Sequence, residues 1–165
     1  MTLDKVVISI SGLEMEIHRL INRERQKFGL MSLVHDDPLA NVARGHSKDM
    51  ATRIFFAHST PEGVNPTDRA KVKGYKCRKN YGSYYTDGIA ENIFKSHLYK
   101  SVTYINKIAH YNWMTQSEIA TEAVCGWMAS AGHRKNILTT TYDREGIGIA
   151  VYLERNEIYI TQNFC

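Results

Sequence analysis

The sequence predicts an α+β fold in which helices come first and a pair of strands ends the chain. Apolar residues recur at helical spacing through the first half, and from Gly146 onward they alternate with small or polar residues. Because each helix has one apolar face to bury, we expect the helices to pack on an antiparallel sheet. A chain of 165 residues, 43% hydrophobic and 23% charged, suits one domain with a buried core. We assign residues 11–165 to it and residues 1–10 to an N-terminal extension.

Capping residues and stop signals predict three helices in the first half, over residues 11–28, 37–54 and 66–73. The first begins with the capping-box pattern Ser11-x-x-Glu14 and ends before a glycine. The other two begin at Asp-Pro and Asn-Pro pairs, which place proline at the first helical position.

The second half is predicted to contain one helix and a C-terminal hairpin. A second capping box starts a helix over residues 115–131. The hairpin follows over residues 146–164 and turns at Asn156, which tolerates the positive φ of a tight turn. Residues 76–88 are polar and rich in Gly and Tyr, so we predict a loop there. The apolar residues of 95–113 follow neither the helical nor the strand spacing regularly, so we expect irregular structure with some helix there.

Charge and hydropathy exclude several classes of protein. The net charge is +4, and six basic residues without an acid occur between Arg69 and Lys79, just before a tyrosine-rich stretch. Cations beside aromatics can bind nucleic acid, but no nucleic-acid motif is present, so we predict a solvated loop and no nucleic-acid partner. No apolar run approaches the roughly 18–20 residues that span a bilayer, so no transmembrane segment is predicted.

The three cysteines form no Cys-x-x-Cys pair, which argues against a thiol metal site. Cys125 lies in an apolar helical stretch, where a small buried thiol is expected. Cys77 and Cys165 lie at edge positions and could be joined if the chain is exported.

Of the seven histidines, five are predicted to be structural or exposed: His46 as a hydrogen-bonded core residue, and His18, His35, His97 and His110 as surface residues. His58 and His133 differ because each follows a predicted helix end, where functional side chains are common. Glu91 is a lone carboxylate in a short apolar segment, which is costly unless it is paired or bound to a metal. Spacing alone does not bring the three together, because no local i, i+4 pair links them.

A series of short motifs runs in order from about Leu13 to Cys165. They are Ile21-Asn22-x-x-Arg25, Ala43-x-x-His46-Ser47-x-Asp49-Met50, Phe55-Phe56-x-His58, Pro66-x-Asp68-Arg69, Gly74-Tyr75, Glu91-Asn92-Ile93, Gly126-Trp127-Met128-x-Ser130-x-Gly132-His133-Arg134-x-Asn136-Ile137-Leu138, Gly146-Ile147-Gly148 and Thr161-Gln162-Asn163-Phe164. Together they resemble the CAP superfamily of cysteine-rich secretory proteins, antigen 5 and pathogenesis-related proteins, in its prokaryotic SCP-like branch.

The resemblance implies a three-layer α-β-α sandwich whose cleft holds two His and two Glu able to bind a divalent metal, often zinc. His58, Glu91 and His133 match three members of that tetrad. The fourth, a Glu, is replaced by Ser130, and the glycine that precedes the family's first Glu is replaced by Ala90. Two His and one Glu are still the ligand set of an open zinc site. The family motifs on either side also lead us to predict a Cys77–Cys165 disulfide, with Cys125 free.

The resemblance is compatible with two functions. The first, which we prefer, is a secreted or cell-surface monomer that binds a lipid, peptide or protein in the cleft, with or without a metal. The second is a zinc-dependent hydrolase using His58, Glu91 and His133, for which no further carboxylate is identifiable as a base. Ser130 and Arg134 are predicted to line the cleft. We expect Arg134 to hold protein groups rather than a ligand, because its planar fork of donors suits backbone carbonyls.

Overall fold

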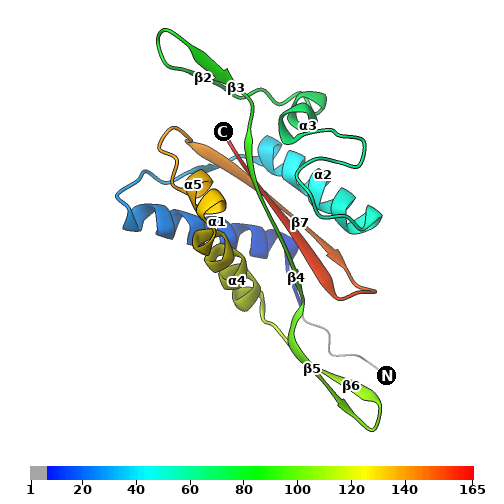
Figure 1. The fold of residues 1–165 in the computed structure, drawn as a ribbon. Coiled ribbons are helices and arrows are strands. Elements are labelled where there is room, and N and C mark those ends of the chain that lie inside the picture. Colours follow the sequence, from blue (N-terminus) through cyan, green and yellow to red (C-terminus); the bar gives the residue numbers. More distant parts are fainter. Residues whose placement is uncertain (1–6) are drawn as a thin grey trace.

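The computed structural model describes residues 7–165 and is built around a four-stranded sheet (Figure 1). One strand pair is parallel, between the first two strands in the spatial order, and the other neighbours are antiparallel. In that spatial order the strands are β1 (Val34–His35), β7 (Arg144–Tyr152), β8 (Glu157–Phe164) and β4 (Ala90–His97). The hairpin of β7 and β8 is the predicted one, and Asn156 at its turn has a φ of 53°.

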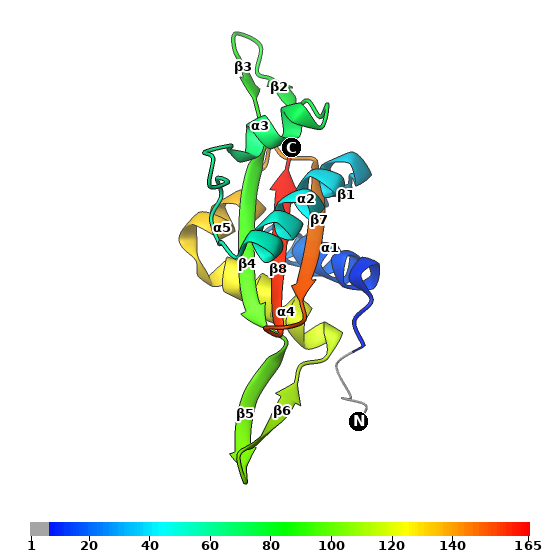
Figure 2. The ribbon, with the colours of Figure 1, turned by 90° about the vertical axis from the view of Figure 1, so that its right-hand side faces the viewer.

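Helices cover both faces of this sheet, so the predicted three-layer sandwich and the α+β class are confirmed (Figures 1 and 2). One face carries α2 (Asp37–Arg53), with α3 (Pro66–Val72) beside it. The other carries α1 (Ile10–Lys27), α4 (Gln116–Ala129) and α5 (Ala131–Ile137). The main core lies beneath α1 and α4, where Trp127 is 1% exposed and donates from Nε1 to the Ile93 carbonyl at 3.0 Å. No helix within residues 7–165 combines the length and apolar character needed to cross a membrane.

Two hairpins extend beyond the sandwich at opposite ends (Figure 2). One pairs β2 (Arg78–Asn80) with β3 (Tyr85–Asp87), and the other pairs β5 (Tyr99–Ile105) with β6 (Ile108–Trp113). The sequence predictions of a loop over 76–88 and of irregular structure with some helix over 95–113 are therefore wrong. Apart from Trp113 at the end of β6, the strands of these hairpins do not pack on the main core. Their apolar residues are therefore not forced into the strict alternation that identifies a half-buried strand.

Helix starts were predicted to within one or two residues. The caps of α1 and α2 differ from the predicted ones. The N-cap of α1 is Ser9, which accepts a hydrogen bond from the Gly12 amide, and not Ser11. Glu14 is consequently inside the helix and buried, where it pairs with Arg44 at 2.7 Å. The N-cap of α2 is Asp36, so Pro38 is its second helical residue and not its first. The caps of α3 and α4 are the predicted ones, and α4 has a complete capping box. The helix predicted to continue to residue 131 ends at Ala129 instead. Ser130 lies between α4 and α5, and α5 begins at Ala131. Most of the predicted extension, residues 1–6, lies outside the described residues.

A disulfide joins Cys77 to Cys165, with Cα atoms 5.7 Å apart, as predicted. Cys125 is free, also as predicted, but it is exposed and not buried. Its neighbour Val124 and the residue two positions on, Trp127, take the inward face of α4, and Cys125 turns outward between them.

Two glycines of β7 allow α2 to lie directly on the sheet. A Cβ on Gly146 would stand 2.1 Å from the Ala40 amide nitrogen, and one on Gly148 would stand 2.0 Å from the Arg44 amide nitrogen. Both neighbours are backbone atoms of a packed helix, which cannot rotate away as a side chain can. Glycine is therefore required at this contact between layers.

We predict that Gly148→Ala lowers the free energy of unfolding by about 3 kcal/mol, because α2 must move off the sheet to admit the methyl group. Urea unfolding of the purified variant measures the loss. Gly132→Ala is the matched control: it also adds one methyl group, but nothing lies within 4 Å of it, and it sits in a helix. The control is expected to gain about 0.5–1 kcal/mol. Equal stabilities for the two variants would contradict the close packing of α2 on β7.

Candidate functional site

Glu91 is the centre of the candidate site. It lies on β4, and its side chain is 2% exposed. Its Oε2 accepts hydrogen bonds from Arg69 Nη2 at 2.5 Å and from Asn163 Nδ2 at 3.0 Å. Its Oε1 lies 3.0 Å from His58 Nδ1. The carboxylate is therefore paired and hydrogen-bonded through both oxygens, which compensates for its burial.

The pKa of Glu91 lies below its ordinary value, although two effects oppose each other. Burial raises the pKa, whereas the hydrogen bond with His58, the charges of Arg69 and His46 and the hydrogen bond from Asn163 lower it further than burial raises it. Glu91 is thus an anion at neutral pH, and Arg69 is the permanent cation beside it.

Arg69, on α3, also holds the loop that carries His58. Its Nη1 donates to the His58 carbonyl at 2.6 Å and to the Val64 carbonyl at 3.1 Å, while Nη2 bonds Glu91. One guanidinium thus fixes both the carboxylate and the loop that faces it. Sequence reasoning missed this role, because Arg69 was counted as the first member of a solvated basic run. The signal that could have found it is its place in the Asp68-Arg69 motif.

The structure places His58 against Glu91, and it joins the His133 backbone to the strand of Glu91 through the Asn92 side chain. The side chain of His58 is half exposed. With Nδ1 committed to Glu91, Nε2 is the ring nitrogen that remains for a ligand. His133 lies on α5, and its pKa is lowered first by burial and then by the charge of His58. His133 therefore lies within reach of the charge that a protonated His58 carries.

Asparagine side chains tie α5 to β4 behind these histidines. Asn136 donates from Nδ2 to the Glu91 carbonyl at 3.2 Å and to Asn92 Oδ1 at 2.9 Å. Asn92 in turn donates to the His133 carbonyl at 3.2 Å and to Gln162 Oε1 at 3.1 Å. The backbone positions of Glu91 and His133 are thus set by the same pair of amides.

The hydrogen bonds of Glu91 oppose direct coordination of a metal by its carboxylate. No group of three or more His, Cys, Asp and Glu residues within the described part of the chain, 7–165, is arranged to hold a metal ion. Both Glu91 oxygens already accept hydrogen bonds. A carboxylate that accepts from one ring nitrogen of a histidine commonly orients the other nitrogen toward a metal. Direct coordination by Glu91 stays a prediction.

His46 lies behind Glu91, fully buried, as the predicted hydrogen-bonded core residue. Its Nε2 lies 2.9 Å from the Ala57 carbonyl and 3.8 Å from Glu91 Oε1. Burial is the largest effect on its pKa, which is lowered, so the ring is neutral at pH 7. Because Nε2 faces a carbonyl it carries the proton, by assignment from the hydrogen bond, and Nδ1 is then an acceptor. This Nδ1 has no hydrogen-bond partner in the described chain.

A cavity of about 440 Å³ lies between α2 and α3, next to Glu91. His46 and Arg69 both line it, and the buried Nε of Arg69, like His46 Nδ1, has no partner in the described chain. The rest of the lining is Val42, Gly45, Asp49, Val64, Val72 and Lys73. Arg69 Nε and His46 Nδ1 are both buried, so these two residues line the cavity with other parts of their side chains.

The remaining predicted positions fall outside this centre. Arg134 donates from Nη1 to the Met128 carbonyl at 3.2 Å, the kind of backbone contact expected of it. Ser130 is the half-buried residue between α4 and α5, and its place in a cleft stays a prediction. His97 and His110 are exposed as predicted. His18 is not a free surface residue: its Nδ1 lies 2.6 Å from the buried Glu145, which draws the ring into the fold, and His35 is also half-buried beside it.

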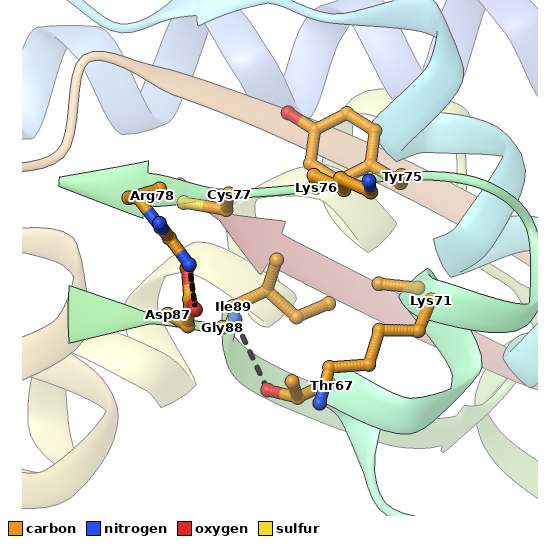
Figure 3. A pocket seen from close by; sticks show the side chains of 10 residues that line it. Thr67, Lys71, Tyr75, Lys76, Cys77, Arg78, Asp87, Gly88 and Ile89 are labelled. Carbon is orange, nitrogen blue, oxygen red and sulfur yellow. Dashed lines mark hydrogen bonds and ion pairs between the residues drawn. The ribbon is translucent and has the colours of Figure 1, made fainter.

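A second cavity, of about 490 Å³, lies at the base of the β2–β3 hairpin and does not include the histidines (Figure 3). The disulfide residue Cys77, together with Ile89 and Tyr75, lines it, and Arg78 and Asp87 pair across its mouth at 2.8 Å. We place the candidate site at Glu91, where the titratable side chains converge, and not at this cavity.

The chain is similar to known proteins over nearly its whole length. It is 35% identical over 156 residues to YkwD, an uncharacterized protein of Bacillus subtilis, and the match covers 94% of this chain and 48% of that protein. It is 30% identical over 154 residues to the uncharacterized membrane protein YlbC of the same organism, covering 92% of this chain and 34% of the relative. The chain thus spans about half, or less, of these curated relatives.

Solved structures show the same fold. An extracellular protein containing a SCP domain from Bacillus anthracis aligns with a TM-score of 0.67 and 27% identity, covering 99% of this chain and 43% of that one. An outer surface protein from Borrelia burgdorferi aligns with a TM-score of 0.68 and 17% identity, covering 95% and 94% of the two chains. The model of the cysteine-rich secretory protein family, CAP, matches residues 18–164. From its fold, its motifs and this match, the chain belongs to the CAP family of cysteine-rich secretory proteins.

Proposed function

We propose that this chain is an exported, monomeric CAP-domain module that binds a ligand in the cleft around His58, Glu91 and His133 and catalyses no reaction there. Export is supported by the Cys77–Cys165 disulfide, since such a bond persists in an oxidising compartment. The extracellular SCP-domain protein of Bacillus anthracis agrees with that location.

The observation that carries the binding function is the cavity of about 440 Å³ between α2 and α3, which is lined by His46 and Arg69, two neighbours of the buried Glu91. Apolar side chains, Val42, Val64 and Val72, share its wall with the charged Asp49 and Lys73. We therefore infer that a lipid, peptide or protein ligand enters this cavity with an apolar part against the valine side chains.

A divalent cation, zinc being the usual choice of imidazole ligands, would be held by His58 and His133. Glu91 would accept the Nδ1 proton of His58 in a hydrogen bond and so present Nε2 to the ion. When bound, the ion would supply a Lewis-acidic contact for a ligand oxygen. The low pKa of Glu91 and its bond to Arg69 make it a weak general base, which is why we do not favour the zinc-dependent hydrolase.

We predict that zinc binding, measured by isothermal titration calorimetry, is lost when His58 and His133 are both replaced by alanine. Both histidines lie outside the main core, so the double variant is expected to keep its fold by circular dichroism. His97→Ala, which removes an exposed imidazole from the same strand as Glu91, is the matched control and should bind zinc like the parent. Undiminished binding by the double variant would disprove the assignment of the metal to these histidines.

The same protein samples test the absence of catalysis. Peptide and ester substrates are incubated with zinc-loaded protein, with and without a chelator. We expect no turnover in either arm. Turnover that the chelator abolishes, and that the double variant lacks, would replace the binding function with the hydrolase.

A further inference from the structure

The β5–β6 hairpin carries an exposed apolar tip at the end of the molecule farthest from the β2–β3 hairpin (Figures 1 and 2). Tyr104, Ile105 and Ile108 are 68%, 55% and 60% exposed. Ile105 and Ile108 are paired across the turn and share one face of the hairpin, while Tyr104, the residue before Ile105 on β5, lies on the other face. Clustered large apolar side chains of this kind on a soluble surface mark a contact with something else.

Behind the tip, the same hairpin carries a cluster of aromatic side chains. Tyr111 stacks on Trp113 at 4.7 Å between ring centroids, and Tyr99 meets Tyr111 edge-on at 5.0 Å. These rings are half-buried, and the strand register places them nearer the open end of the hairpin than the turn. Tyrosine and tryptophan behind an aliphatic end are the arrangement that suits the boundary between hydrocarbon and water.

The charge of this region has one sign. Residues 92–117 contain Lys95, Lys100 and Lys107 and no Asp or Glu. Lys107 stands in the turn itself, between the two isoleucines, with a φ of 65°. Lys100 is neutralised by Glu118 on α4, so the cation that remains at the tip is Lys107. An apolar tip with a positive charge complements an anionic lipid surface.

We propose that the tip of the β5–β6 hairpin inserts into the surface of a lipid bilayer that contains anionic lipids. Tyr104, Ile105 and Ile108 enter the acyl-chain boundary, and Lys107 pairs with a lipid phosphate. A second copy of the chain is a poorer partner for this tip. A stable interface buries about 800 Å² on each partner, and three residues at a convex tip offer far less surface than that. The lysines of the two copies would also repel each other. This inference is independent of the proposed function, since the tip and the Glu91 site use different residues.

Co-sedimentation with vesicles tests the proposal on the full chain. Wild-type protein is expected to bind vesicles of phosphatidylcholine mixed with phosphatidylglycerol, and to bind pure phosphatidylcholine more weakly. The double variant Ile105→Ser, Ile108→Ser should lower the partition coefficient at least about tenfold, since two side chains lose their insertion. Lys107→Gln should lower it about fivefold on the anionic vesicles and leave it unchanged on the neutral ones.

Tyr84→Ser is the matched control, because Tyr84 is 60% exposed near the tip of the opposite hairpin. It is expected to bind vesicles like the wild type. An equal loss in this control would show that general stickiness, and not the β5–β6 tip, causes sedimentation. Absence of wild-type binding to anionic vesicles would refute the proposal, as would a dimer in sedimentation equilibrium that the two isoleucine substitutions abolish.

Discussion

Replacing Glu91 by Gln is expected to lower the free energy of unfolding at pH 7 by about 3–5 kcal/mol, the usual loss when one partner of a buried ion pair is removed. The substitution leaves the Arg69 guanidinium, 12% exposed, without its anion. It also leaves one acceptor oxygen in place of two, so either His58 or Asn163 then faces an amide NH2 group. Urea unfolding followed by circular dichroism measures the loss.

A double-mutant cycle separates the energy of the Glu91–Arg69 ion pair from the effect of changing each side chain alone. Arg69→Met should also destabilise the protein, because it leaves the carboxylate buried and charged. The double variant Glu91→Gln, Arg69→Met should be more stable than the sum of the two single losses implies, since it leaves neither charge unpaired. Strict additivity would mean that the two side chains do not act as a pair.

The difference in the free energy of unfolding between wild type and Glu91→Gln should become smaller as the pH falls. The folded-state pKa of Glu91 is below its ordinary value of 4.5. The unfolded chain therefore takes up a proton at a higher pH than the folded one does, and the stability that Glu91 contributes is fully present above about pH 4.5. That contribution is lost as the pH falls through the folded-state pKa. The two unfolding free energies should converge in acid.

Removing the disulfide is expected to be the other large loss of stability. Cys77 and Cys165 are 88 positions apart, for which the loop-closure relation gives about 4.6 kcal/mol. The last residue stays hydrogen-bonded through its backbone to Arg144 in the folded protein, so the effect acts mainly through the freedom of the unfolded chain. The variant Cys77→Ser, Cys165→Ser should show the loss in urea unfolding.

Cys125→Ser provides the control for the loss of a sulfur atom. Cys125 is free and exposed, so its replacement should change the free energy of unfolding by less than about 0.5 kcal/mol. If the double serine variant were as stable as this control, the disulfide would not constrain the unfolded chain.

The sequence predicted those parts of the fold that depend on local chemistry. Asn65 and Thr115 cap their helices as expected because a cap needs only the next three residues. The β5–β6 hairpin was not predicted, because most of its side chains do not pack on the core and so do not alternate regularly between apolar and polar. Cys125 was predicted to be buried because its stretch of helix is apolar. One side of such a helix still faces solvent, and Cys125 lies on that side.

The candidate site was predictable only in part. Glu91 and His58 lie 33 positions apart, so their spacing in the sequence could not predict that they are in contact. The resemblance to the CAP motifs predicted it. Arg69 was missed because a guanidinium in a run of cations looks solvated, whereas this one turns inward onto a buried carboxylate. The unused atoms of His46 and Arg69 belong to tertiary packing and leave no trace in the sequence.

The amides that join α5 to β4 have a consequence for the spacing of Glu91 and His133. Asn92 and Asn136 carry no ionisable group, and they fix the backbones of Glu91 and His133 to each other. These hydrogen bonds do not depend on the protonation of either side chain. A change of pH that alters the charge of the site therefore leaves the two backbone segments at the same separation.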